Sequence, residues 1–296
     1  MKRKAGNYNV LDQHAYYVPG VADMFVLLAW LLAGSLLGNL VTLAFASILG
    51  PEAGMEYGMI LAYPVMFIPE MIYAASKSGR NSFVRKGIKL DSANFGGSGK
   101  GWICAVIVAV ATIALSFCAD AITAVMPPMP EWLETALKSM TNGTLWVNLL
   151  CVSIFAPFFE EWLCRGMVLR GLLGNGVKPV WAIIISAAFF AIIHANPWQA
   201  IPAMILGALF GYVYYKTGSL KLTMLMHCTN NTFAIICSNI DAFEDMESWH
   251  DVLQGPLYWI IFAGCLLLVC LAVLFFKRIP VNGPCGNCDE VPVTIG

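Results

Sequence analysis

Eight long apolar segments, separated by short polar stretches, follow one another along the 296 residues of this chain. Each has, or nearly has, the length at which an α-helix crosses the roughly 30 Å hydrocarbon core of a bilayer. The segments at 180–196 and 200–215 are short, which allows them to be broken or re-entrant. Because lipid forces a spanning backbone to satisfy its own hydrogen bonds, all eight are expected to be helical. They lie at 22–49, 56–75, 102–126, 144–163, 180–196, 200–215, 219–240 and 256–276.

Composition supports this pattern. Hydrophobic residues make up 59% of the chain and charged residues only 12%, about half of the roughly 25% charge found in soluble domains. We therefore predict an all-α fold: a polytopic membrane helix bundle of about eight transmembrane helices, forming a single membrane domain over residues 1–296. The expected location is an integral, multi-pass membrane protein, in the plasma membrane if the host is bacterial. The lipid bilayer is its expected environment, and no nucleic-acid partner is expected.

Basic residues predict the orientation. Apart from Lys138 and Arg165, which is expected to pair with Glu161 in the motif described below, they precede the first segment, follow the last, or lie in every second loop between. The excess of Lys and Arg marks the cytoplasmic side, so both termini are predicted to be cytoplasmic. The first apolar run is too long for a 7–15-residue signal-peptide core and is interpreted as an uncleaved span. The basic residues on the predicted inner side are Lys2, Arg3, Lys4, Lys77, Arg80, Arg85, Lys86, Lys89, Lys100, Arg170, Lys178, Lys216, Lys221, Lys277 and Arg278.

The polar stretches suggest little independent structure. The basic, Gly/Ser-rich stretch 76–101 indicates a flexible cytoplasmic loop. The stretch 127–143 is consistent with an interfacial helix on the outer face. Cys285 and Cys288 form one Cys-x-x-Cys in the short cytoplasmic tail 282–296, which is weak evidence for a metal or redox role. The other eight cysteines lie in apolar segments and are expected to act as small hydrophobes.

Two adjacent carboxylates interrupt the fourth apolar segment, in Glu160-Glu161-Trp162-Leu163-Cys164-Arg165. Charged groups inside a membrane are costly and mark functional sites. Glu161 and Arg165 are four residues apart with the acid first, the favourable order for a helical ion pair. Glu160 points about 100° away around the helix and has no local partner, as suits a general base. Two alternatives remain: both acids are structural, or this end of the helix lies at the cytoplasmic interface.

Two further polar groups follow in the next apolar segments. Glu160 and His194 flank a helical hairpin with its turn near Gly171–Gly176, so they are predicted to face each other at similar depth. A satisfied buried histidine is the alternative for His194. His227 and Asn231 share one helical face and could donate hydrogen bonds to an oxyanion in a dry cavity. Interhelical hydrogen bonding is the structural alternative for this pair.

The motifs Glu-Glu-x-x-x-Arg, Phe-x-x-x-His and His-x-x-x-Asn, in this order on successive membrane helices, resemble the CPBP (Abi) family of intramembrane proteases. These are CAAX prenyl endopeptidases of the Ras-converting-enzyme type and bacteriocin-processing relatives. The resemblance covers about 144–240, which it implies is the protease core. It implies that Glu160 activates water, that His194 holds that water, and that His227 and Asn231 stabilise the oxyanion. Glu161 and Arg165 would form part of the scaffold and tune the electrostatics of the site.

The expected function is therefore an intramembrane endopeptidase that hydrolyses a peptide bond of a membrane-associated peptide or protein with glutamate-activated water. The family is often labelled metalloprotease, yet this mechanism requires no metal and the sequence has no His-Glu-x-x-His. Zinc held by His194, His227 and a carboxylate remains an alternative. A transporter with intramembrane charges is a second alternative. A non-proteolytic membrane factor, such as a peptide immunity protein or scaffold, is a third.

Overall fold

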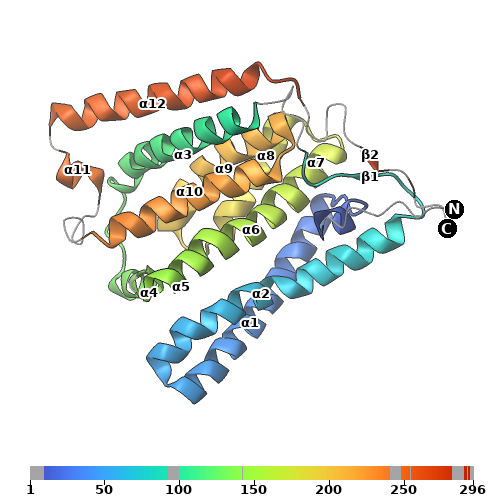
Figure 1. The fold of residues 1–296 in the computed structure, drawn as a ribbon, viewed down its shortest axis with the longest axis horizontal. Helices are drawn as coiled ribbons and strands as arrows, with labels where there is room; N and C mark the ends of the chain where they lie inside the picture. Colours follow the sequence, from blue (N-terminus) through green and yellow to red (C-terminus); the bar gives the residue numbers. More distant parts are fainter. Residues whose placement is uncertain are drawn as a thin grey trace.

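The computed structural model describes residues 10–92, 100–141, 143–240, 248–253, 255–281, 290–291 and 293. Helices make up nearly all of the regular structure in this part of the chain (Figure 1). One helix, which carries the Glu-Glu motif, is built from five consecutive parts: α5 (Leu145–Asn148), η2 (Leu149–Phe155), α6 (Ala156–Glu161), η3 (Trp162–Leu169) and α7 (Arg170–Gly174). The other helices are η1 (Val10–His14), α1 (Val21–Leu49), α2 (Pro51–Asn81), α3 (Gly101–Thr123), α4 (Glu131–Thr141), α8 (Pro179–Ile192), α9 (Pro197–Thr217), α10 (Leu220–Ser238), α11 (Trp249–Val252) and α12 (Pro256–Lys277).

Each of the eight predicted apolar segments is a helix, and the prediction of a polytopic helical membrane protein is confirmed. Within the described residues, five helices are long and apolar enough to cross a membrane, while α8 is apolar but shorter. The five are α1, α2, α3, the continuous helix from Leu145 to Gly174, and α12. Large apolar side chains such as Phe25 and Ile48 are 71% and 79% exposed to the surroundings, as expected of lipid-facing positions. The count of eight crossings stays a prediction.

The segment that precedes α1 and the last residue of α12 both lie at one end of the bundle. The Arg170 guanidinium donates hydrogen bonds to the carbonyls of Ala15 (3.2 Å) and Ile88 (2.8 Å). At the same end, the Lys216 ammonium donates to the carbonyl of Lys277, the last residue of α12, at 3.3 Å. The N–H of Ser92 donates to Gly218 O at 2.8 Å, so the segment that follows β1 contacts the end of α9. An even number of crossings agrees with this arrangement, and the assignment of this end to the cytoplasm stays a prediction.

The polar stretches differ in part from expectation. The all-α prediction omitted a two-residue antiparallel ladder in which β1 (Gly87–Ile88) pairs with β2 (Glu290–Val291). The stretch 76–101 is not a loop throughout, because α2 continues to Asn81. Its Gly/Ser-rich part, 93–99, lies outside the described residues, as do Cys285 and Cys288. The helix expected in 127–143 is present as α4, and the eight cysteines of the described part are free thiols.

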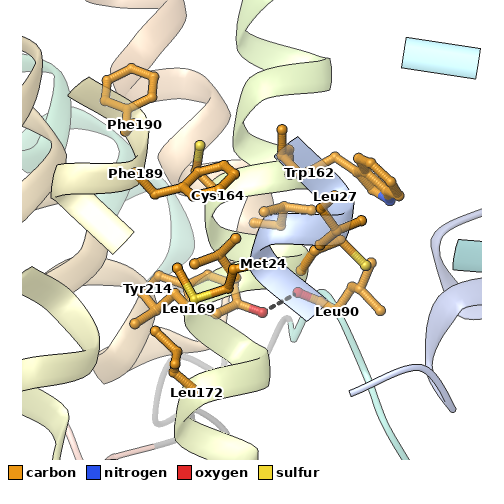
Figure 2. Close-up of a cluster of buried hydrophobic side chains, with 14 of the residues drawn as sticks. Met24, Leu27, Leu90, Trp162, Cys164, Leu169, Leu172, Phe189, Phe190 and Tyr214 are labelled. Carbon is orange, nitrogen blue, oxygen red and sulfur yellow. Dashed lines mark hydrogen bonds between the residues drawn. The ribbon is translucent and has the colours of Figure 1, made fainter. Parts of the chain in front are cut away.

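A buried apolar cluster joins the α1–α2 hairpin to the helix that carries the Glu-Glu motif (Figure 2). Met24 and Leu27 of α1 belong to this cluster together with Trp162 and Leu169 of η3. The hairpin itself is closely packed: a Cβ on Gly34 would lie 1.8 Å from the carbonyl oxygen of Met66. Only glycine allows this close approach of α1 to α2.

Candidate active site

The Glu-Glu motif lies on α6, a short α-helical stretch between two π-helical stretches, η2 and η3. Pro157 explains part of this local geometry, because its nitrogen has no hydrogen to donate to the preceding turn. At the end of η2, the N–H of Ala156 bonds to the carbonyl of Cys151, five residues back. Continuing this pattern, Pro157 would have to donate to Val152, and it cannot. π-helical turns often occur beside functional groups, because they change the direction of the side chains that follow.

Asn231 of α10 supplies the donor that Pro157 lacks. Its Nδ2 donates to the carbonyl oxygen of Val152 at 2.8 Å, while its Oδ1 accepts from Nδ2 of Asn230 at 3.1 Å. One amide hydrogen of Asn231 therefore makes an interhelical hydrogen bond, which was the structural alternative for this residue. An Asn amide has two hydrogens, so the second remains for the oxyanion role expected from the resemblance.

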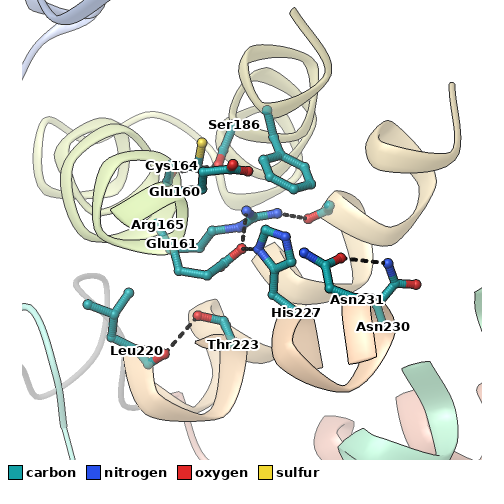
Figure 3. A network of polar contacts seen from close by, with 12 residues as sticks. Glu160, Glu161, Cys164, Arg165, Ser186, Leu220, Thr223, His227, Asn230 and Asn231 are labelled. Carbon is teal, nitrogen blue, oxygen red and sulfur yellow. Dashed lines mark hydrogen bonds and ion pairs between the residues drawn. The ribbon is translucent and has the colours of Figure 1, made fainter. Parts of the chain in front are cut away.

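Glu161, Arg165 and His227 form a buried ionic network (Figure 3). Glu161 Oε1 accepts from Arg165 Nη1 at 2.8 Å and lies 3.2 Å from His227 Nδ1. The Glu161 and Arg165 side chains are completely buried. Arg165 Nη2 also donates to the carbonyl of Gly207 at 3.0 Å. The ion pair predicted from the four-residue spacing is present, and His227 joins it from another helix.

Aromatic rings surround this network on the side of α8 and α9. The guanidinium of Arg165 lies 4.6 Å from the ring centre of Phe190 and 5.4 Å from that of Phe210. Both rings also pack against the imidazole of His227, at centroid distances of 5.4 and 6.1 Å. Aromatic faces stabilise a desolvated guanidinium, so the cation is held by one carboxylate, one carbonyl and two rings.

The contact with Glu161 determines what His227 can do. A carboxylate oxygen that already receives an arginine proton can only accept, so His227 Nδ1 must carry the proton of their hydrogen bond. The Nε2 atom of neutral His227 is then an acceptor. It becomes a donor to an oxyanion only when the imidazole is doubly protonated. The predicted oxyanion role therefore depends on the protonation state of His227.

Glu160 has a partner that the sequence did not reveal. The hydroxyl of Tyr63, on α2, donates to Glu160 Oε1 at 2.5 Å. Glu160 Oε2 is buried and has no hydrogen-bond partner among the described residues. The expectation that Glu160 lacks a local partner holds along its own helix, but Tyr63 satisfies one carboxylate oxygen from 97 positions away. The other oxygen remains able to bind water.

His194 lies just beyond the end of α8, in the turn to α9. Its Nδ1 is 2.7 Å from the Phe190 carbonyl, which can only accept, so neutral His194 presents Nε2 as an acceptor. The following residue, Ala195, has φ +55°, a conformation unusual for a residue with a Cβ. Asn196 donates to the His194 carbonyl at 2.9 Å and caps α9. The turn thus fixes the position of the imidazole.

The fold is compatible with the prediction that His194 faces Glu160, which stays a prediction. The turn between the two helices, Asn175–Lys178, begins later than predicted, because Gly171–Gly174 still belongs to α7. At a rise of about 1.5 Å per residue, Glu160 and His194 lie at similar heights from this turn. Phe190 lies between the histidines, with its ring 4.9 Å from His194 and 5.4 Å from His227.

Sequence reasoning missed Tyr63 and a further carboxylate, the buried Glu70, both on α2. Glu70 is completely buried, and neither of its oxygens has a hydrogen-bond partner among the described residues. Glu70 was detectable, because it is an acid inside an apolar segment, the signal that revealed Glu160. Tyr63 was not, because a tyrosine in an apolar helix is common and only the fold shows its partner.

The donor groups present do not form a recognisable zinc site. Within the described residues, no group of three or more His, Cys, Asp or Glu side chains is arranged to hold a metal ion. The zinc alternative would combine His194 and His227 with a carboxylate. One oxygen of each carboxylate is already engaged, since Glu161 Oε1 bonds Arg165 and His227, and Glu160 Oε1 bonds Tyr63. The Oε2 atoms of both residues have no hydrogen-bond partner among the described residues, so the zinc alternative stays a prediction.

Comparison with known proteins agrees with the motif positions. A family model described as type II CAAX prenyl endopeptidase Rce1-like matches residues 142–233. The uncharacterized protein YyaK of Bacillus subtilis (strain 168) is 26% identical over 127 residues, which cover 36% of this chain and 42% of that protein. The chain thus spans less than half the length of this relative. No solved structure matches the chain. Residues 142–233 of this multi-pass membrane protein are therefore similar to the Rce1-like type II CAAX prenyl endopeptidases, and this segment contains all three motifs.

Proposed function

We propose that this chain is an intramembrane endopeptidase in which Glu160 activates water to hydrolyse a peptide bond. The observation that carries the proposal is the state of the Glu160 carboxylate. One oxygen is fixed by Tyr63, and the other is buried and free of partners in the described structure. A carboxylate in a poorly solvated site, with one free oxygen, is suited to accept a proton from water.

The proposed steps balance as follows. Glu160 Oε2 takes a proton from water, and the water oxygen bonds to the scissile carbonyl carbon. The carbonyl electrons move to oxygen, where doubly protonated His227 and the second N–H of Asn231 stabilise the negative charge. Collapse of this intermediate breaks the C–N bond, and Glu160 returns the proton to the leaving amine. His194 Nε2 accepts a hydrogen bond from the attacking water, which its fixed tautomer allows.

The substrate class proposed is a peptide or protein at the membrane surface or within the bilayer. The helices that carry the site expose large apolar side chains, such as Ile154 and Ile192, which suit contact with a substrate segment that is itself in the membrane. A prenylated CAAX peptide is the first candidate, because of the family to which residues 142–233 are similar.

The test is hydrolysis by the purified full chain in liposomes. Fluorogenic peptides, with and without a prenyl group, are incubated in ¹⁸O-water and the products are identified by mass spectrometry. The proposal predicts two fragments, with one ¹⁸O in the new carboxyl group, and the same rate after treatment with a strong chelator. Loss of cleavage with chelator and recovery with zinc would instead establish the metal-dependent alternative.

One observation favours a second candidate, a non-proteolytic factor that binds a peptide or partner. The polar groups of the site largely satisfy one another: Asn231 with Val152, Arg165 with Glu161 and Gly207, and His227 with Glu161. Such a network could serve only to hold helices together. Binding of these peptides to the folded protein without any ¹⁸O-labelled product would support this candidate.

A further inference from the structure

Tyr63 contacts the site from a part of the chain that the family match does not include. The match covers residues 142–233, whereas Tyr63 lies on α2, in the N-terminal hairpin. Its hydroxyl donates to Glu160 Oε1 at 2.5 Å, a short hydrogen bond of the kind that hydroxyls form with carboxylates. The hydrogen-bond donor to Glu160 Oε1 therefore comes from a helix that lies outside the matched segment.

Aromatic packing holds the Tyr63 ring in place. The ring lies 5.7 Å from that of Phe67, one turn further along α2. Phe67 is buried and stacks on Phe159 at a centroid distance of 5.0 Å, with an angle of 14° between the rings. Because Phe159 directly precedes Glu160, the same two helices are joined by ring stacking and by the hydrogen bond. The phenol thus packs on a ring that is itself stacked against the motif helix, which restricts the movement of its hydroxyl away from the carboxylate.

The hydrogen bond selects which oxygen of Glu160 can act. A carboxylate free to rotate presents either oxygen to a substrate, but here Oε1 is occupied and Oε2 is without a partner in the described structure. The short donor contact fixes the plane of the carboxylate about its side chain. A base held in one orientation reacts faster, because the geometry required for proton transfer is already formed.

We propose that Tyr63 is a positioning residue that orients the Glu160 carboxylate, so that the α1–α2 hairpin completes the active site. This inference rests on the proposed function of Glu160 as the base. Tyr63 acts through Glu160 and transfers no proton itself. The contribution of the hairpin is then specific: it supplies one hydroxyl and the stacked pair of rings that hold this hydroxyl in position.

The test compares kcat and KM of the full chain in liposomes for wild type, Tyr63→Phe and Glu160→Gln. Tyr57→Phe is the matched control, because Tyr57 is on the same helix and packs on Trp146 rather than on the site. Removal of a hydrogen bond to a charged group predicts a fall in kcat of about tenfold to a hundredfold for Tyr63→Phe. KM is expected to stay within about twofold, since the phenylalanine ring preserves the packing.

The outcomes distinguish the positioning role of Tyr63 from the proposed function of Glu160 as the base. If Glu160→Gln is inactive and Tyr63→Phe matches wild type in kcat, the positioning role is wrong while the proposed function stands. If Glu160→Gln cleaves as well as wild type, the proposed function is wrong. A measurement that does not need activity covers the case in which no cleavage is seen: the free energies of unfolding of wild type, Tyr63→Phe, Glu160→Ala, which removes the acceptor, and the double variant. Additive effects would show that no hydrogen bond joins the two side chains and would overturn the inference.

Discussion

At the scale of single residues, the site contains a buried guanidinium, that of Arg165, whose charge is compensated by one buried carboxylate. Arg165 is completely buried, and its carboxylate partner Glu161 is equally buried. Removing one member of a buried ion pair leaves the other charge uncompensated, which is more damaging than removing both. His227 also contacts Glu161, so it loses the orientation of its imidazole when Glu161 is replaced.

We predict that Arg165→Met lowers the free energy of unfolding by about 3–5 kcal/mol, because it strands the Glu161 carboxylate. The double variant Glu161→Gln/Arg165→Met should lose less. The measurement is unfolding in mixed detergent micelles. Lys221→Met is the control, because the Lys221 side chain is 71% exposed, and Asp91, although only 5% exposed, keeps hydrogen bonds from the N–H groups of Leu220 and Lys221. A pair with one solvated member is expected to contribute only about 0–1 kcal/mol. Equal losses for Arg165→Met and Lys221→Met would contradict this account.

Some residues of the site could be predicted from sequence and others could not. The spacing of Glu161 and Arg165 fixes their contact, because both lie on one helix. Tyr63 and Glu160 are 97 positions apart, so their contact depends on how two helices pack. The proton position on His227 likewise follows from Glu161, a residue of a different helix. Local spacing therefore predicted pairs within a helix, and the hydrogen-bond partners between helices required the fold.

At the scale of elements, the helix from Leu145 to Gly174 shows why a hydrophobic pattern alone does not predict where a helix ends. Its apolar run predicted a span at 144–163, and the helix indeed begins at Leu145. It continues to Gly174, through residues whose charges suggested a loop. Arg170 lies inside the helix because backbone carbonyls, including those of Ala15 and Ile88, accept all the hydrogen bonds described for its guanidinium.

Pro157 and Asn231 give a prediction for this element. Asn231→Leu should lower the free energy of unfolding by about 1–3 kcal/mol, because the Val152 carbonyl loses its donor. In a Pro157→Ala background the same change should cost less, since the alanine introduced there has an N–H that can bond this carbonyl. A double-mutant cycle of unfolding free energies measures the difference. An identical cost in both backgrounds would show that Pro157 is unrelated to the role of Asn231.

At the scale of the whole molecule, the predicted fold class and membrane location are confirmed, and the sides of the membrane remain predictions. Hydropathy reveals helices that face lipid, because lipid requires apolar side chains along the whole segment. It is weaker for α9 and α10, which face other helices and carry polar groups such as His227 and Asn231. The docking of η1 and β1 against Arg170 could not be predicted, because it involves backbone carbonyls, which every residue has.

Docking of η1 predicts a pH dependence of stability. Burial lowers the pKa of His14, an effect opposed by its hydrogen bond to the Met71 carbonyl and assisted by the nearby charge of Arg170. The folded protein thus binds fewer protons at His14 than the unfolded chain does. Stability is complete above the unfolded pKa of about 6.5 and falls as the pH drops below it, by up to about 1.4 kcal/mol per pH unit.

Thermal unfolding between pH 8 and pH 5 measures this effect. His14→Gln should reduce the loss of stability at low pH, whereas His250→Gln, at an exposed position of α11, should leave it unchanged. The same pH dependence in wild type and His14→Gln would rule out His14 as the responsible group.

The most direct test of the central claim is the rate of peptide cleavage by Glu160→Gln, measured beside wild type in the same liposomes. Glutamine keeps the size of the side chain and can still accept a hydrogen bond from Tyr63, but it cannot take a proton from water. The account predicts a folded protein whose kcat falls by at least about 10²–10⁴-fold, the usual contribution of a general base. A folded Glu160→Gln variant that cleaves at the wild-type rate would contradict it.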